Sequence, residues 1–362
     1  MPRGGKLGFG VIGCGNVANN YYLPYIARNY RLVAVADVNP ERARRSAALW
    51  KAERWYGEPS KLLADPEVEA VVIATPHDTH ASLAVQAAES GKHFIVQKPM
   101  ATSLRDAEMV VRSVEKSGVL AVAEPSEALL SPVYRALKRE LQQLGRLCFA
   151  VCHTGHSGPT WSEAFFREER GGGVLFDLAV YDVARLLALF GEPRRVAAIG
   201  TVLLRQRLVI DPESVTRAIS EATYGRGVYY FHDLKPSVPV EVNAFDNFAG
   251  LLEYDGGVAA ILANYTTFHG LQMPPFQVYC TDGAAAVQPW APLITLVTRA
   301  GTRSLGRSEI GEVRPYYHES VDHLAQCVAK GEEPLPSVKW GFKVTSVLLK
   351  LREAAERAAV NP

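Results

Sequence analysis

The chain has 362 residues, of which 48% are hydrophobic and 21% charged, as in an ordinary globular protein. Its 39 lysine and arginine residues are matched by 38 aspartate and glutamate residues, which leaves a net charge of +1. This balance excludes the strong positive field that recruits nucleic acid or anionic membrane surfaces. No apolar run approaches the ~18 residues of a membrane helix, so neither kind of partner is expected.

The length suits two domains better than one, because single hydrophobic cores stop growing at smaller sizes. The five cysteines are odd in number and lack the paired CxxC spacing of a structural zinc site. We therefore expect no metal, and reduced thiols in a cytoplasmic protein. The first residues run straight into a strand-like segment without a signal-peptide h-region, which indicates the same location.

The first 125 residues alternate between apolar strands and helices. Strands are predicted at Lys6–Ile12, Leu32–Ala36, Ala70–Ala74, His93–Val96 and Val119–Ala123, and helices at Ala81–Ser90 and Leu104–Lys116. Near-continuous apolar strands separated by helices predict a parallel sheet that is covered on both faces. We expect residues 1–125 to form this α/β domain.

The pattern changes near Leu144–Gly145, where longer strands begin. They are predicted at Leu147–Thr154, Val196–Leu204, Gly250–Tyr254, Val258–Tyr265, Gln277–Cys280 and Leu293–Thr298, with helices at Val174–Phe190, Tyr316–Lys330 and Gly341–Ala358. Residues 126–362 should therefore form an α+β domain with a large, mostly antiparallel open sheet. The C-terminal helix is a candidate to pack back on the first domain.

The turn after the first strand, Gly13-Cys14-Gly15-Asn16-Val17-Ala18, fits the dinucleotide fingerprint with alanine in third position. It follows a strand and opens a helix, whose N-terminus favours phosphate. Asp37 stands about 20 residues later at the end of the second strand, where the fingerprint places an acid. We expect the first domain to be a Rossmann domain. Its predicted cofactor contacts here are Gly13, Gly15, Asn16, Val17, Ala18 and Asp37.

Asp37 favours NAD over NADP. Its carboxylate is expected to accept hydrogen bonds from the adenosine ribose hydroxyls and to repel a ribose 2′-phosphate. Arg42, Arg44 and Arg45 lie close behind it, however, and a helix-surface arginine could swing round to meet that phosphate. The alternative is that these arginines form a solvated helix face. NADP is therefore the less favoured cofactor.

Two further segments lie at the carboxyl ends of predicted parallel strands, where ligands bind in open sheets. In Ala74–His80 we predict cofactor contacts for Thr75, Pro76 and His80, although this stretch could equally be a proline turn and helix cap. In Gln97-Lys98-Pro99 we predict cofactor contacts for Gln97 and Lys98. Lys98 can also hydrogen-bond a reacting hydroxyl and stabilise the developing alkoxide, unless it is an ordinary surface lysine.

Together with the stretch from Gly171-Gly172-Gly173 to Tyr181, these motifs resemble the Gfo/Idh/MocA family of sugar-related oxidoreductases over nearly the whole chain. The resemblance implies a nicotinamide at the cleft between the domains. It also implies a homodimer or homotetramer built on the sheet face of the second domain. Two positions depart from the family pattern. Gln97 stands where glutamate is usual, and Tyr181 replaces the usual helix histidine, as in members resembling dihydrodiol dehydrogenases.

Asp177 and Tyr181 are four residues apart and share one face of the predicted helix, so both can point into the cleft. Tyr181 is predicted to move the proton, with Lys98 lowering the pKa of its phenol, and Asp177 to position substrate or tune Tyr181. The alternatives are a core tyrosine and a helix-capping aspartate. His156 and Trp161 are softer candidates for substrate contact.

The predicted function is NAD-dependent hydride transfer involving a ring hydroxyl of a sugar, aminosugar or cyclitol. One alternative is an NAD-dependent glycosidase that oxidises its substrate transiently and eliminates the aglycone. Another is a non-catalytic NAD-binding sensor. The segment Ile210–Val240 is an unusually long excursion between strands, and a substrate lid, an oligomer contact and a mobile hairpin are all open for it.

Overall fold

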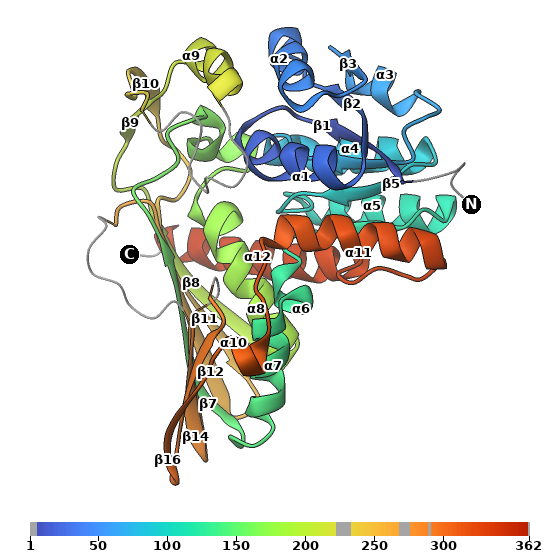
Figure 1. Ribbon diagram of the computed structural model, residues 1–362. Coiled ribbons are helices and arrows are strands. Elements are labelled where there is room, and N and C mark those ends of the chain that lie inside the picture. Colours follow the sequence, from blue (N-terminus) through green and yellow to red (C-terminus); the bar gives the residue numbers. More distant parts are fainter. Residues whose placement is uncertain (1–5, 222–232, 268–275, 289–290, 361–362) are drawn as a thin grey trace.

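The computed structural model describes residues 6–221, 233–267, 276–288 and 291–360. A parallel sheet with its helices forms one part of the molecule, and a larger sheet with helices on one face forms the other (Figure 1). The first sheet ends with β6 (Ala121–Ala123), and α6 begins at Glu127. We propose that the two domains divide at residue 125, between these elements.

The first sheet has the doubly wound order of a Rossmann domain. Its strands are β1 (Gly8–Ile12), β2 (Arg31–Ala36), β3 (Arg54–Tyr56), β4 (Ala70–Ile73), β5 (His93–Val96) and β6, in the order β3-β2-β1-β4-β5-β6. All neighbouring pairs are parallel, which confirms the predicted sheet. The order reverses between β1 and β4, and ligands bind outside the carboxyl ends of the strands at such a point.

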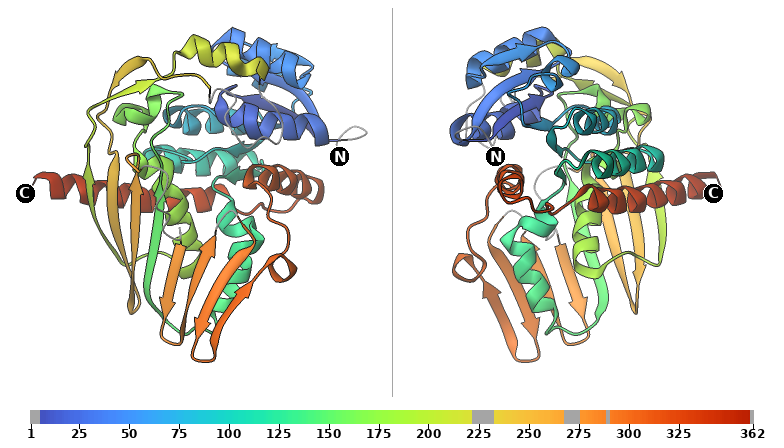
Figure 2. Two further views of the ribbon diagram at one scale, coloured as in Figure 1. Left: turned by 60° about the vertical axis from the view of Figure 1, so that its left-hand side comes forward. Right: turned by 90° about the vertical axis from the view of Figure 1, so that its right-hand side faces the viewer.

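Helices cover both faces of this sheet (Figure 2). They are α1 (Leu23–Asn29), α2 (Pro40–Trp50), α3 (Pro59–Leu63), α4 (His80–Glu89) and α5 (Leu104–Ser117). At the starts of α2 and α5, capping side chains supply hydrogen-bond acceptors to otherwise unpaired backbone N–H groups. Asn39 Oδ1 accepts from the backbone of Glu41 and Arg42 at the start of α2, and Ser103 Oγ accepts from Asp106 at the start of α5.

The second sheet has eight strands, β7 (Leu147–Gly155), β8 (Arg195–Thr201), β11 (Asn247–Tyr254), β12 (Gly257–Asn264), β13 (Phe276–Cys280), β14 (Gly283–Gln288), β15 (Leu293–Thr298) and β16 (Gly301–Leu305). Their order is β16-β15-β14-β13-β7-β12-β11-β8. Every neighbouring pair is antiparallel except β7 and β12. This confirms the mostly antiparallel open sheet, although its strands β14 and β16 were not predicted, and neither was β3 of the first sheet.

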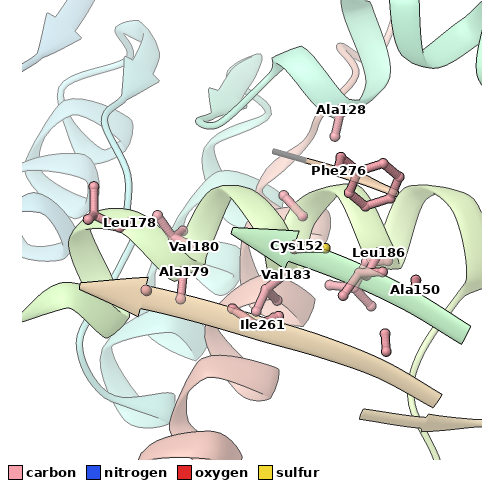
Figure 3. Packing of buried hydrophobic residues seen from close by; sticks show 14 of the residues in the cluster. Ala128, Ala150, Cys152, Leu178, Ala179, Val180, Val183, Leu186, Ile261 and Phe276 are labelled. Carbon is pink, nitrogen blue, oxygen red and sulfur yellow. The ribbon is translucent and has the colours of Figure 1, made fainter. Parts of the chain in front are cut away.

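One face of the large sheet carries the helices α6 (Glu127–Leu130), α7 (Pro132–Leu141) and α8 (Val180–Phe190), while no described helix covers the other face (Figure 1). The predicted helix over 174–190 begins as a π-helical turn, η5 (Leu175–Ala179), and continues as α8. Val180 and Val183 are fully buried, and Leu187 is nearly so. This inward face packs over β7 and β12 beside Cys152 and Ile261 (Figure 3).

The chain end returns to the first domain. Helix α11 (Tyr316–Lys330) packs against β5 and β6, and its Val321 and Leu324 lie in the core that contains Phe9 and Ile95. Helix α12 (Val338–Val360) packs on α5 and β6 as well as on β8 and α8 of the second domain. Helix α12 therefore packs against both domains.

The excursion 210–240 is described in part. It contains α9 (Pro212–Arg217), η6 (Ala218–Glu221) and β10 (Val238–Glu241), and β10 pairs with β9 (Gln206–Val209). Residues 222–232, with the aromatic run at 229–232, lie outside the described residues.

Candidate functional site

The glycine turn after β1 has the backbone that a dinucleotide site needs. Gly13 has φ of +92°, and a Cβ there would lie 2.4 Å from the carbonyl oxygen of Ala74, so only glycine fits. A Cβ on Gly15, in contrast, would meet no atom within 4 Å. The backbone of Gly15 is therefore open to close approach just before the first helical turn. This open cradle fits the pyrophosphate of NAD.

Asp37 is fixed at the end of β2 by the turn itself. Its Oδ2 accepts from the backbone N–H of Cys14 and its Oδ1 from that of Asn39, both at 2.8 Å. A carboxylate offers about four acceptor positions, so two remain for the ribose hydroxyls. Of the other predicted contacts in the turn, Ala18 is fully buried, and Asn16 Oδ1 accepts from Asn20 Nδ2 at 2.5 Å.

The loop over residues 74–80 is held by its own hydrogen bonds. The hydroxyl of Thr79 lies 2.8 Å from Thr75 Oγ1 and 2.7 Å from the carbonyl oxygen of Pro76. The ring nitrogens of His80 lie 2.8 Å from the carbonyl oxygens of Pro99 and Thr75, and burial lowers the pKa of the ring. His80 therefore ties together the loops that follow β4 and β5. Direct contact of Thr75, Pro76 and His80 with NAD stays a prediction.

His77, which was not a predicted site residue, joins this loop to the second domain. It is buried, and its Nδ1 lies 2.8 Å from the carbonyl oxygen of Gly171. Burial, followed by the positive charge of Lys98, lowers the pKa of His77 to about 3. The ring is therefore neutral at pH 7, and Nδ1 donates its proton to Gly171. Beside it, Arg170 Nε donates to Asp78 Oδ2 at 2.7 Å.

Lys98 and Asp177 form the centre of the site. Lys98 follows β5 in the first domain and Asp177 lies in η5 of the second, and both are buried, with 9% and 7% exposure. Lys98 Nζ donates to Asp177 Oδ1 at 2.5 Å and to its carbonyl oxygen at 2.8 Å. The other carboxylate oxygen accepts from the hydroxyl of Tyr265 at 2.7 Å. This ion pair therefore crosses the interface between the domains.

Charge on the pair is set by competition between burial and attraction. Burial favours the neutral amine of Lys98, but the charge and hydrogen bond of Asp177, helped by Tyr181, together outweigh burial and raise the pKa of Lys98. Burial alone would raise the pKa of Asp177, yet the ammonium of Lys98, with smaller contributions from His77 and His156, lowers it to about 2. At neutral pH the site therefore holds an ammonium and a carboxylate.

Tyr181 lies beside this pair, as the helix spacing predicted. Lys98 Nζ is 5.1 Å from the centre of its ring, and its hydroxyl lies 2.8 Å from that of Tyr316. The expected lowering of its pKa, however, is wrong in net effect. Burial raises the pKa of Tyr181 above its ordinary value, and Lys98 and the hydrogen bond to Tyr316 oppose burial only in part. Tyr181 is therefore a neutral phenol at pH 7.

The two predicted substrate residues of the second domain lie at the margin of this cluster. The ring of His156 is 5.3 Å from that of Tyr265, and its Nδ1 accepts from Gly158 N at 2.9 Å. Trp161 is 5.6 Å from Phe165 and packs against the apolar cluster around Ile219. Their contact with substrate stays a prediction.

Sequence reasoning missed the tyrosines that complete the site. Tyr265 follows β12, and Tyr316 starts α11, so nothing in the spacing of the chain links either to Asp177 or Tyr181. It also missed Tyr22, whose hydroxyl accepts from Gln97 Nε2 at 2.6 Å and donates to Glu124 at 3.2 Å. Burial raises the pKa of Glu124 to about 7. Gln97 thus takes part in a buried polar chain.

Neither a metal-binding cluster nor a membrane-spanning helix is found among the described residues. No group of three or more histidine, cysteine, aspartate or glutamate side chains there is arranged to hold a metal ion. No helix in the same part of the chain combines the length and apolar character needed to cross a membrane.

Two family models match the chain. One is described as an oxidoreductase family with an NAD-binding Rossmann fold and matches residues 7–124. The other is the Gfo/Idh/MocA C-terminal domain, which matches residues 134–286. Together they cover well over half of the sequence.

Curated relatives and a solved structure extend this likeness. The scyllo-inositol 2-dehydrogenase (NAD(+)) of Bacillus subtilis is 30% identical over 177 residues, 48% of this chain and 50% of that protein, so the chain spans about half the length of this relative. The trans-1,2-dihydrobenzene-1,2-diol dehydrogenase of Mus musculus is 25% identical over 97% of this chain and 96% of its own. A levoglucosan dehydrogenase in complex with NADH and levoglucosan shares the fold, with TM-score 0.79, 19% identity and 97% of each chain covered.

Proposed function

Because the chain belongs to the Gfo/Idh/MocA family of NAD-binding oxidoreductases, we propose that it transfers hydride between NAD and a ring hydroxyl of a sugar, aminosugar or cyclitol. The observation that carries the proposal is the cluster of Lys98, Asp177 and Tyr181. Lys98 follows β5, whose carboxyl end lies at the edge of the sheet where ligands bind, and Asp177 and Tyr181 meet it there from the second domain.

Lys98 orients and polarises the reacting oxygen. The ammonium donates twice to Asp177 and also shares a hydrogen bond with Tyr181, so we propose that the substrate oxygen binds where Lys98 and Tyr181 meet. A positive charge in this buried place stabilises the alkoxide that develops as the C–H bond breaks. Asp177 keeps the ammonium charged and in position, and Tyr265 holds the carboxylate from its other side.

Tyr181 moves the proton. Bound NAD would supply the acceptor for the hydride that leaves the carbinol carbon. In alcohol oxidation, the phenolate of Tyr181 takes the hydroxyl proton of the substrate. In the reverse direction, the neutral phenol donates a proton to the oxygen of the carbonyl substrate. Because the pKa of Tyr181 is raised, the resting protein is in the protonation state for carbonyl reduction. Alcohol oxidation then speeds up with rising pH, as the phenol ionises.

The test is NADH formation from NAD in the presence of a panel of pyranosides, inositols and aminosugars. Lys98→Met and Tyr181→Phe should each lower turnover by about 10²- to 10⁴-fold, while NADH still binds. Lys92→Met is the matched control, since Lys92 precedes the same strand and donates to carbonyl oxygens of Asp65 and Val68. It should leave turnover unchanged.

Other outcomes favour the alternatives. Unchanged turnover in Lys98→Met removes Lys98 from the mechanism. Release of a chromogenic aglycone without accumulation of NADH indicates the NAD-dependent glycosidase. NADH binding without turnover on any member of the panel indicates the NAD-binding sensor. No contact among the described residues favours either alternative.

The open face of the large sheet supports a homodimer or homotetramer. Its outward positions carry exposed apolar side chains, namely Phe149, Ile199, Leu251, Val258, Leu262, Tyr279, Leu293 and Val297. An apolar surface that spans the strands of a sheet marks a protein–protein contact. We propose that a second copy of the chain covers this face. The five free cysteines support a cytoplasmic location for the assembly.

A further inference from the structure

The segment 210–221, here called the strap, leaves the second domain and lies on the first. It comprises α9 and η6, and α9 lies beside α2 in both figures that show the whole molecule (Figures 1 and 2). Ile210, Val215, Ala218 and Ile219 of the strap are buried in one apolar cluster. Leu49 and Trp50, from the end of α2, pack against that cluster. Apolar contacts therefore hold the strap against the end of α2.

Polar contacts at the other end of α2 fix the strap to Arg42. Arg42 Nε donates to Thr216 Oγ1 at 2.8 Å, and its Nη2 donates to the carbonyl oxygen of Pro212 at 3.3 Å. Thr216 is 4% exposed, and its hydroxyl donates to the same carbonyl oxygen of Pro212 at 2.8 Å. Thr216 is thus oriented by the backbone of the strap so that its lone pairs face the guanidinium.

Arg42 follows soon after Asp37, the residue predicted to bind the adenosine ribose. It stands in the first turn of α2, five residues after Asp37, and its backbone N–H donates to the capping side chain of Asn39. Burial and Asp37 raise the pKa of the Cys14 thiol, and the charge of Arg42 is among the effects that oppose them. The guanidinium therefore acts electrostatically on the glycine turn.

An arginine near the end of the second strand is the usual partner of a ribose 2′-phosphate in NADP sites. Here Asp37 repels that phosphate, but a free guanidinium in the first turn of α2 would offset the repulsion. We propose that the strap, through the hydroxyl of Thr216, holds Arg42 away from the ribose and so makes the site selective for NAD over NADP. This selectivity for NAD refines the proposed function. It depends on dinucleotide binding and not on the reaction.

The test measures dinucleotide binding and needs no substrate. NADH and NADPH are titrated separately into the full-length chain, and each Kd is taken from the fluorescence of the reduced nicotinamide. Thr216→Val removes the hydroxyl but keeps the side-chain shape, and should lower the Kd for NADPH roughly tenfold while leaving that for NADH unchanged. Adding Arg42→Leu to Thr216→Val should abolish the gain in NADPH affinity, because the guanidinium that Thr216→Val releases is then missing.

Two controls separate selectivity from simple packing. Thr216→Ser keeps a hydroxyl, so the ratio of the two dissociation constants should equal that of the unaltered chain. Arg44→Leu removes an exposed arginine of the same helix that pairs with Glu41, and should change neither constant. The proposal is overturned if the unaltered chain binds NADPH as tightly as NADH. It is also overturned if Thr216→Val leaves NADPH binding unchanged or weakens both nucleotides by the same factor. Catalytic failure with intact selectivity would count against the proposed function alone.

Discussion

Tyr181 is the residue whose chemistry depends most on its neighbours. Burial holds its phenol in the neutral form, and two contacts work against burial, the ammonium of Lys98 and the hydroxyl of Tyr316. Lys98 is anchored by Asp177, so its distance from the ring is fixed. Tyr316, the second contact, is buried at the start of α11.

Tyr316→Phe should move the pH dependence of alcohol oxidation. Without the Tyr316 hydroxyl the pKa of Tyr181 rises further, so the rate of oxidation reaches its plateau at higher pH and falls at pH 7. Carbonyl reduction uses the neutral phenol and should keep its rate there. The measurement is kcat against pH in both directions.

Tyr254→Phe is the control for Tyr316→Phe. It removes another tyrosine hydroxyl, at the opposite end of the β11–β12 hairpin from the site. An oxidation profile that does not move in Tyr316→Phe, or that moves equally in Tyr254→Phe, would show that Tyr316 does not tune Tyr181.

Sequence alone could place part of this cluster. Lys98 could be assigned to the cofactor edge because it follows a parallel strand, and Tyr181 and Asp177 to one face because helix geometry sets their spacing. Tyr265 and Tyr316 could not be added, since only the packing of distant elements brings them near. The predicted shift in the pKa of Tyr181 had the wrong direction, because charges can be read from a sequence, whereas depth of burial cannot.

At the level of elements, a buried ionic triad fastens α8 to its surroundings. Arg185 is 1% exposed and donates to Glu127 Oε1 of α6 and to Asp182 Oδ1 of α8, both at 2.7 Å. Asp182 Oδ2 accepts from the hydroxyl of Thr154 on β7 at 3.0 Å. The helix that follows Asp177 is thereby held against two other elements.

Arg185→Met should lower the free energy of unfolding by about 3–5 kcal/mol, because it leaves two buried carboxylates without their counter-charge. Adding Glu127→Gln and Asp182→Asn should recover most of the loss, since no buried charge then remains unpaired. The midpoint of thermal unfolding reports both changes. A triple variant no more stable than Arg185→Met would mean that lost packing, and not charge, accounts for the effect.

Two strands that sequence reasoning missed, β14 and β16, share a physical reason. β14 (Gly283–Gln288) contains three alanines and β16 (Gly301–Leu305) is exposed at four of its five positions, so neither has the apolar β-branched pattern of a strand. Pairing with β13 and β15 makes them strands. The parallel strands β1, β2, β4 and β5, in contrast, could be predicted because each has a near-continuous apolar run in its own sequence.

At the scale of the whole molecule, the uncovered sheet face predicts self-association. Ile199 on β8 is 64% exposed and Leu251 on the neighbouring β11 is 50% exposed. Ile199→Glu combined with Leu251→Glu should reduce the mass measured by light scattering to that of a single chain, because each buried carboxylate at such a contact is costly. Met109→Glu, at an exposed apolar residue of α5, is the control and should keep the assembly. A chain that is monomeric before mutation would rule out this interface.

The parallel pair at the middle of the large sheet has a consequence for biosynthesis. The neighbours of β7 in the sheet are β12 and β13, and about one hundred residues separate β7 from β12. During translation β7 therefore emerges long before either partner exists, with both edges unpaired. The intervening connection carries η5, α8 and the strap, so all of them are made before the sheet can close around its central strand. Both edges of β7 thus stay open to misassembly until β12 is made, and one edge stays open until β13 is made.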